Sequence, residues 1–273
     1  MKKIKSFISL VFATIALCSG ALFASCQSST QTGVLPPVPS ETPIPPTEEN
    51  DPETDVPEAI LPSTADYIRC TGNSVNIRSG AGTEYSVLGS AQLGTVYAVM
   101  EKSGNWYKTF YRNKTAYIYA SYTSVFTLEK TDDERVENVI EEGYKLLGVP
   151  YVYGAVRLHD GKGNLLGGFS AQKFDCSSLI QYIFYKGAGE ILQVTTRTQV
   201  KQGEYVDRKD LKRGDCIYFT NEERQYKTGV ERVGHVALYL GNDYILHTAS
   251  DYARIEKMSA KRWSFYVEAR RFV

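Results

Sequence analysis

A cysteine lies where a glycine-rich segment changes into a helical pattern. Residues 161–168 contain four glycines, and Cys176 follows them. After Cys176, apolar residues recur at the spacing of one helix face, at Leu179, Ile180, Ile183 and Phe184. A thiol at a helix N-terminus lies at the positive end of the helix dipole, which favours the nucleophilic thiolate. A free cysteine is equally typical of a buried core position, so Cys176 is a candidate nucleophile that needs a base elsewhere in the chain.

The charge of the chain is balanced overall but unevenly distributed. Residues 1–26 carry three lysines and no acid, and residues 27–65 carry seven acids and no Lys or Arg. The remaining residues, 66–273, carry a net charge of +4. This weakly basic balance argues against a nucleic-acid partner, which requires a strongly basic surface. It is compatible with an anionic polymer such as a cell wall.

The first 65 residues divide into an apolar segment and a proline-rich segment. Residues 1–25 have a basic start, an apolar run and small residues after it, which predicts an export signal peptide. The segment 23–26 resembles a bacterial lipobox, so Cys26 is the expected lipidation site and membrane anchor. The alternative is ordinary cleavage near Ala24 and a secreted protein. Residues 26–65 hold nine of the ten prolines among Ser, Thr, Glu and Asp, which predicts an extended, disordered tether.

Residues 66–127 have the pattern of a small β-barrel. Short strands separated by glycine and asparagine turns are predicted at residues 67–70, 74–78, 95–100, 106–110 and 115–118. The motifs at 76–80, 104–107 and 116–118 resemble those of bacterial SH3 (SH3b) domains, which accompany cell-wall enzymes and are thought to help position wall peptides. We expect Trp106 and Tyr107 to be barrel core residues rather than ligand contacts.

Residues 131–273 have helical patterns first and strand patterns later. A capping box at Thr131–Glu134 begins a helix whose apolar face includes Val136 and Ile140, and Gly148 stops it. The Cys176 helix comes next. Strands are then predicted at residues 215–219, 235–240, 244–248 and 266–272. This order predicts an α+β fold with an antiparallel sheet.

The remaining cysteines and the first histidine suggest no metal chemistry. No Cys-x-x-Cys pair occurs, so neither a zinc site nor another cofactor is expected. We interpret Cys70 and Cys216 as core thiols, with a disulfide between them as the alternative. His159 lies in the glycine-rich segment beside Asp160, and we expect it to be solvated.

Two further histidines lie on consecutive predicted strands. His235 opens one strand and His247 lies on the next. A nucleophilic cysteine needs a base, and that base needs a third group to orient it. Because strand side chains alternate, a two-residue loop at Asn242–Asp243 would place the two histidines on opposite faces. We therefore predict an odd-length connection or a β-bulge between them.

Residues 133–273 resemble the NlpC/P60 family of papain-like cell-wall endopeptidases. The matching motifs lie at residues 150–155, 174–178, 195–199, 214–219, 234–241 and 245–247. The resemblance implies that Cys176 is the nucleophile, His235 the base and His247 the third residue. It also places Tyr151 at the active-site tyrosine position, and Arg197 in a motif that contributes substrate contacts. Asp175 and Ser177 would recognise the free amine of a stem peptide.

Three departures from the family pattern affect the expected substrate contacts. Ala155 replaces the second glycine of an aromatic-Gly-Gly motif, and Val194 lies where the family often has arginine. The loop at 156–173 is longer than the usual connection. It either shapes the cleft as a lid or is a tolerated surface insertion.

The resemblance implies a peptidoglycan hydrolase that cuts stem peptides between D-γ-glutamate and the diamino acid. Cys176 and His235 would form a thiolate–imidazolium pair, and backbone N–H groups at the helix start would hold the oxyanion. The protein would be a monomer in the cell envelope, with peptidoglycan as partner. Two alternatives stay open: a wall-binding or adhesion protein with an inactive second domain, and an amidase or acyltransferase of the same fold.

Overall fold

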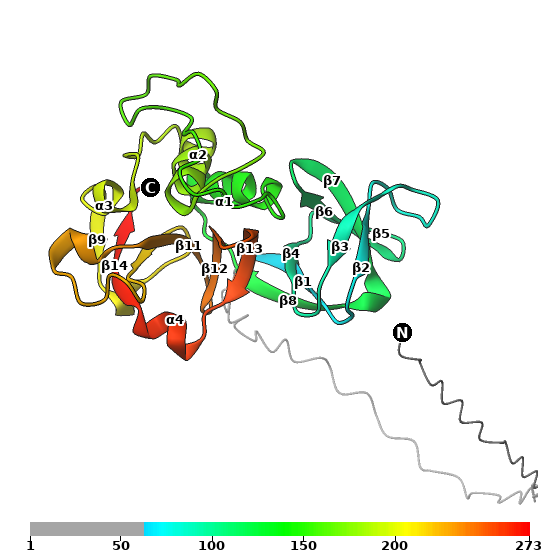
Figure 1. Cartoon of the computed structure of the whole chain (residues 1–273). Helices are drawn as coiled ribbons and strands as arrows, with labels where there is room; N and C mark the ends of the chain where they lie inside the picture. The colour runs from blue at the N-terminus through cyan, green and yellow to red at the C-terminus, as the bar shows by residue number, and fades with distance from the viewer. Residues whose placement is uncertain (1–62) are drawn as a thin grey trace, which may run out of the picture. The chain divides into compact units, whose positions relative to one another are not determined.

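The computed structural model describes residues 63–273 (Figure 1). The predicted signal peptide, the lipidation site at Cys26 and almost all of the predicted tether lie outside the described residues. The first strand begins at Thr64, so it includes the last two residues of the predicted tether. No helix among residues 63–273 is long and apolar enough to cross a membrane.

The first part of the described chain is built from short antiparallel strands. Three strands that the sequence reading missed, β3, β5 and β8, add to those predicted. One sheet has the order β3-β2-β7-β6-β5, while β1, β4 and β8 belong to another. The bounds are β1 Thr64–Cys70, β2 Val75–Arg78, β3 Val87–Ala91, β4 Val96–Ala98, β5 Glu101–Ser103, β6 Trp106–Tyr111, β7 Lys114–Tyr119 and β8 Thr123–Glu129, with a 3-10 turn at Ala120–Tyr122.

The second part has helices first and an antiparallel sheet after them, which confirms the α+β prediction. Strands β9 and β13 were missed, and α1 is capped by Asp133 rather than Thr131, because the Asp133 carboxylate accepts the Arg135 N–H. The helices are α1 Glu134–Lys145, α2 Cys176–Ala188, α3 Thr196–Gln199 and α4 Ala260–Ser264, with 3-10 turns at Arg208–Asp210 and Gly229–Arg232. The strands are β9 Glu204–Val206, β10 Cys216–Phe219, β11 His235–Gly241, β12 Tyr244–Ala249, β13 Tyr252–Lys257 and β14 Tyr266–Arg271.

A nine-stranded sheet runs through both parts. Its order is β8-β1-β4-β13-β12-β11-β10-β14-β9, so strands of the first part continue the sheet of the second. The junction is a short antiparallel pairing in which Ile255 of β13 lies opposite Val96 of β4. The two regions that the sequence separates at about residue 130 therefore share one sheet.

Helices α1 and α2 pack closely against each other, as Figure 1 shows. A side chain at Gly187 would bring its Cβ within 2.5 Å of the Val139 backbone, so glycine permits this close approach. The apolar face predicted for α2 is confirmed, since Leu179, Ile180, Ile183 and Phe184 are fully or almost fully buried. This packing fixes the start of α2, where Cys176 lies.

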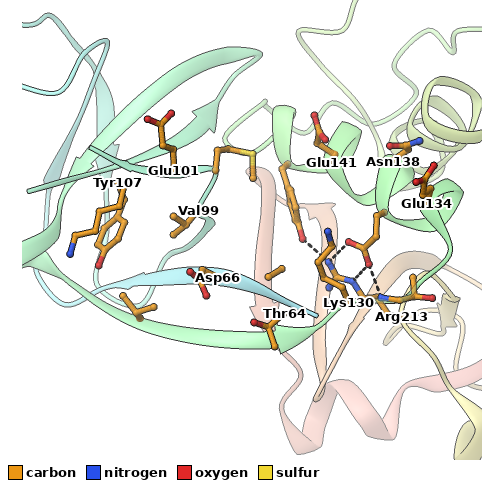
Figure 2. Close-up of a pocket in the computed structure, with 17 residues that line it drawn as sticks. Thr64, Asp66, Val99, Glu101, Tyr107, Lys130, Glu134, Asn138, Glu141 and Arg213 are labelled. Atoms are coloured by element: carbon orange, nitrogen blue, oxygen red, sulfur yellow. Dashed lines mark hydrogen bonds and ion pairs between the residues drawn. The ribbon is translucent and has the colours of Figure 1, made fainter. Parts of the chain in front are cut away.

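A buried arginine joins the two parts beside a cavity of about 690 Å³ (Figure 2). Arg213 makes a two-pronged ion pair with Glu137 at 2.6 and 3.0 Å. It also donates to the hydroxyl groups of Tyr67 and Tyr144 at 3.0 and 3.1 Å, and to the Leu240 carbonyl. Because Tyr67 is on β1 and Glu137 is on α1, this network links the first strand to the helical layer.

Two expectations about individual side chains have clear outcomes. Cys70 and Cys216 are buried free thiols, which confirms the core interpretation and excludes a disulfide between them. Trp106 was expected to be a core residue, and this expectation is wrong. Trp106 is half-buried and lines an open pocket with Tyr119, whose ring centroid lies 5.1 Å from that of Trp106. Tyr107 is also half-buried but packs against the core.

Candidate active site

Cys176 is the first residue of α2, as the sequence predicts. Asp175 caps the helix, with its carboxylate accepting the Ser178 N–H at 2.8 Å. Ser178 returns the bond by accepting the Asp175 N–H at 2.9 Å, which completes a capping box. Cys176 thereby opens onto a pocket of about 460 Å³ that His235, Tyr151, Ser250, Glu222 and Arg262 also line. The predicted nucleophile and the predicted base share this pocket.

The carboxylate of Asp175 is used by the protein itself. Besides the Ser178 N–H, it accepts the Ser177 hydroxyl at 3.0 Å, the Gly154 N–H at 3.2 Å and the Arg157 guanidinium at 3.0 Å. Asp175 is only 4% exposed. Its local role is to cap α2 and to fasten the start of the long loop to that helix.

His235 and His247 lie on the same face of neighbouring strands. Their rings are joined by a hydrogen bond between His235 Nε2 and His247 Nδ1 at 2.8 Å. The β11–β12 turn has two residues, Asn242 and Asp243, both with positive φ. The register then shifts between Tyr239 and Gly241. This bulge confirms the prediction that an extra residue must place both histidines on one face.

Burial governs the charge state of the nucleophile and the base. Burial first, and the charge of Asp175 second, raise the pKa of the Cys176 thiol to about 12, although backbone N–H groups that include that of Val236 lower it. Burial lowers the pKa of His235 well below its usual range, helped by His247 and Arg262. Each shift favours the uncharged form of its own group, so burial opposes the helix dipole, which favours the thiolate.

Tyr151 reaches the pocket through backbone pairing. Its N–H donates to the Asp251 carbonyl, and its strand-like segment bridges to Phe174, two residues before Cys176. Burial raises the pKa of its hydroxyl to about 12, so the group stays a neutral hydrogen-bond donor. Tyr151 thus lies where the sequence reading places it.

Arg197 lies on α3 and makes an ion pair with Glu231 at 3.5 Å. It is not among the residues that line the Cys176 pocket. Its helix is attached to α2 through Gln199, whose amide donates to the Ser177 carbonyl at 2.9 Å. The α3 motif therefore supports the base of the nucleophile helix, and its arginine points to a surface ion pair.

His159 is buried, so the expectation of a solvated side chain is wrong. The residue is 0% exposed, and its Nδ1 accepts the Gly161 N–H at 3.1 Å. Its ring packs near that of Tyr185 on α2, with centroids 5.2 Å apart. Burial lowers its pKa. The long loop folds onto α2 and encloses the imidazole, which sequence neighbours alone did not indicate.

The long loop is attached at several points. Arg157 donates to the Val194 carbonyl at 2.6 Å as well as to Asp175, and Phe169 stacks on Tyr182 of α2. Asn113, in the turn between β6 and β7, donates to the Ala171 carbonyl at 2.8 Å. No residue of the 156–173 loop lines the Cys176 pocket. The loop braces the nucleophile helix from outside the pocket.

The sequence analysis did not predict two charged residues that lie near the histidines. Glu256 on β13 has Oε1 at 3.3 Å from His247 Nε2, and Arg262 of α4 donates to the same oxygen at 3.0 Å. His247 pairs with Arg254 across the strands, so Glu256, two residues further along, is on the same face. The alternation of charged and apolar residues in β13 is a signal that could have found this strand. Among residues 63–273, no group of three or more His, Cys, Asp and Glu is arranged to hold a metal ion.

Family comparisons identify both parts of the chain. Residues 148–271 match the NlpC/P60 family, and residues 73–124 match the bacterial SH3 domain. The first part of the chain therefore matches the bacterial SH3 domain, and the second part matches the NlpC/P60 family.

Curated relatives match less than half of this chain. They include gamma-DL-glutamyl hydrolase of Bacillus subtilis, 34% identical over 46% of this chain and 26% of that protein. Gamma-D-glutamyl-L-lysine dipeptidyl-peptidase of B. subtilis is 32% identical over 44% of this chain and 34% of that protein. Peptidoglycan endopeptidase RipB of Mycobacterium tuberculosis is 30% identical over 45% of this chain and 46% of that protein. The chain spans less than half the length of each.

Two solved structures are among those similar to this chain. One is an NlpC/P60 family protein from Bacillus cereus, with 21% identity and a TM-score of 0.41 over 76% of this chain and 63% of that chain. Another is the peptidoglycan hydrolase RipB from M. tuberculosis, with 27% identity and a TM-score of 0.40 over 51% of this chain and 65% of that chain.

Proposed function

We propose that this protein is a peptidoglycan hydrolase in which Cys176 attacks an amide of the stem peptide. The observation that carries the proposal is the hydrogen bond between His235 and His247, at the pocket that Cys176 shares with His235. The relatives named gamma-glutamyl hydrolase and peptidoglycan endopeptidase support this substrate class.

In the proposed reaction, His235 removes the thiol proton as Cys176 attacks the carbonyl carbon. Because burial opposes the charged form of each group, the proposed proton transfer accompanies attack rather than preceding it. The oxyanion lies by the first N–H groups of α2, and His235 then protonates the leaving amine. Water hydrolyses the thioester with His235 again as base. His247 orients His235 throughout.

The proposed scissile bond joins D-γ-glutamate to the diamino acid of the stem peptide. The names of two relatives, gamma-DL-glutamyl hydrolase and gamma-D-glutamyl-L-lysine dipeptidyl-peptidase, support this bond. Tyr151, Asp175, Ser177 and Arg197 are the proposed substrate-side residues, of which Tyr151 lines the pocket itself. Export, a lipid anchor at Cys26 and a monomeric state complete the proposal.

Mass spectrometry of muropeptides incubated with the purified chain under reducing conditions tests this proposal. We expect products cut after D-glutamate, and no product from Cys176→Ala. Release of a different fragment would favour an amidase or acyltransferase. Wall binding without turnover by the wild-type chain would favour a wall-binding protein and overturn the proposal.

A further inference from the structure

The Nε2 atom of His247 is buried and faces away from His235. The His247 side chain is 0% exposed, and its Nε2 makes no hydrogen bond of standard geometry with the described residues. The acceptor beside it is Glu256 Oε1 at 3.3 Å. A buried polar nitrogen without a partner is costly, so Glu256 is the group available to satisfy it.

Glu256 is held as a carboxylate by two arginines. Arg262 donates to Oε1 at 3.0 Å, and Arg254 Nε lies 3.8 Å from Oε2. Burial alone would raise the pKa of Glu256, but His247 and Arg262 outweigh it and hold the pKa at about 2. An ionised carboxylate accepts hydrogen bonds and cannot donate them.

The ionised Glu256 determines which ring nitrogens of His247 and His235 carry hydrogen. Because Glu256 only accepts, the hydrogen of neutral His247 belongs on Nε2, which leaves Nδ1 as an acceptor. His235 Nε2, 2.8 Å from that Nδ1, must then carry the hydrogen of neutral His235. The remaining ring nitrogen of His235, Nδ1, is left with a lone pair that can take the proton of Cys176.

We propose that Glu256 is a positioning residue that sets the direction of the hydrogen bonds from His235 through His247, and so keeps His235 in its basic tautomer. The opposite arrangement places hydrogen on His247 Nδ1 and on His235 Nδ1, and His235 then has no lone pair for the thiol. When His235 gains the Cys176 proton, the negative charge of Glu256 stabilises the resulting cation through His247. The kinetic part of this inference rests on the proposed function, while the tautomers do not.

Glu256→Leu tests the role because it removes the acceptor. Glutamine would not serve, because Arg262 and His247 Nε2 both lie against the same carboxylate oxygen, and a glutamine oxygen in that position would still accept from His247. Without an acceptor, a hydrogen on His247 Nε2 has no partner, so the preference of both histidines for Nε2 protonation is lost. Glu268→Leu is the matched control, since Glu268 on β14 is an ion-paired glutamate of similar exposure that contacts Arg270.

The measurement is 15N NMR of histidine-labelled protein, in which three histidines supply six ring-nitrogen signals. We expect protonated Nε2 on His235 and His247 in the wild type, and a population protonated at Nδ1 on both in Glu256→Leu. His159 is the internal reference, because its Nδ1 accepts from Gly161 in both proteins. Glu268→Leu leaves the signals of all three histidines unchanged.

The kinetic readout is muropeptide cleavage. We expect kcat of Glu256→Leu to fall by about 10²-fold with KM little changed, at the lower end of what a positioned acid–base group contributes. A wild-type His247 protonated at Nδ1 overturns the inference, even if the variant fails to fold. Unchanged tautomers and kcat in a folded Glu256→Leu overturn it as well. A wild type that cleaves no muropeptide refutes the proposed function but leaves the tautomer result valid.

Discussion

Two buried polar networks in this molecule, one around Arg213 and one around His235, differ in whether all of their members bind within the protein. Around Arg213, an ion pair to Glu137 and bonds to two tyrosine hydroxyls occupy the donors of the guanidinium. Around His235, a row of side chains runs from Glu256 through His247 to His235, which lines one pocket with Cys176. The first network joins structural elements, whereas the second leaves one end free for a substrate. The difference shows that a buried polar cluster becomes a candidate site when one member lacks a protein partner.

The largest expected effect on cleavage comes from removing the thiol of Cys176, which lines the pocket beside the His235 network. Cys176→Ala should lower muropeptide cleavage by about 10⁴-fold or more, because no other group can form the thioester. Its unfolding free energy should change by about 1 kcal/mol or less, since the side chain is half-buried and lines an open pocket. Cys70→Ala is the control: its thiol is buried on β1, so it should lose stability but keep kcat.

Removing His247, which lies between Glu256 and His235, should lower catalysis less than removing Cys176. His247→Ala leaves His235 without its orienting partner, and kcat should fall by about 10²- to 10⁴-fold. Steady-state kinetics on a defined stem peptide measures this loss. A variant with wild-type kcat would show that His235 needs no partner, and would remove the functional distinction between the two networks.

Breaking the first network should affect stability instead of chemistry. Arg213→Met leaves Glu137 buried without its counter-charge and two hydroxyl groups without their donor, which should cost about 3–5 kcal/mol. Urea denaturation measures the loss. The kcat of the folded fraction should stay within about twofold of the wild-type value. A tenfold change in kcat would correspond to about 1.4 kcal/mol of activation free energy.

The matched control for Arg213 is an arginine in an exposed ion pair. Arg135 pairs with Glu190, and both side chains are largely solvent-exposed. Arg135→Met should change stability by about 1 kcal/mol or less, because exposed ion pairs contribute little. Equal losses for the two variants would mean that burial does not distinguish the Arg213 network.

The smallest expected effect is the pH dependence of the second network. His235 acts in its neutral form, and its pKa is lowered, so kcat/KM should be retained below pH 6.5 and lost only as pH falls through the lowered pKa. The raised pKa of Cys176 places thiol ionisation near 12. The profile should therefore be flat from neutral pH to about pH 9. An alkaline decline in that range would indicate a resting thiolate–imidazolium pair.

The positions of the candidate catalytic residues could be predicted from the sequence because they follow local rules. The apolar spacing after Cys176 fixes a helix start, and strand alternation between His235 and His247 requires the bulge that the structure contains. These inferences need only one element or one hairpin. The NlpC/P60 resemblance then assigns roles to residues that periodicity could only place.

Glu256 and His159 could not be placed from the sequence because their environments depend on packing between distant elements. Glu256 faces His247 only once β13 pairs with β12, and β13 was not predicted. His159 is buried because its loop folds onto Tyr185 of α2. The junction at Val96 and Ile255 was missed for a similar reason: each strand there is short, and its partner lies more than a hundred residues away in sequence.

Trapping the acyl-enzyme tests the central claim most directly. The wild-type chain would be mixed with a stem peptide, quenched in acid within one turnover, digested and examined by mass spectrometry. The account predicts an adduct on the peptide containing Cys176, with the mass of the acyl half of the substrate. Cleavage that proceeds with no adduct on Cys176, and that persists in Cys176→Ala, would contradict it.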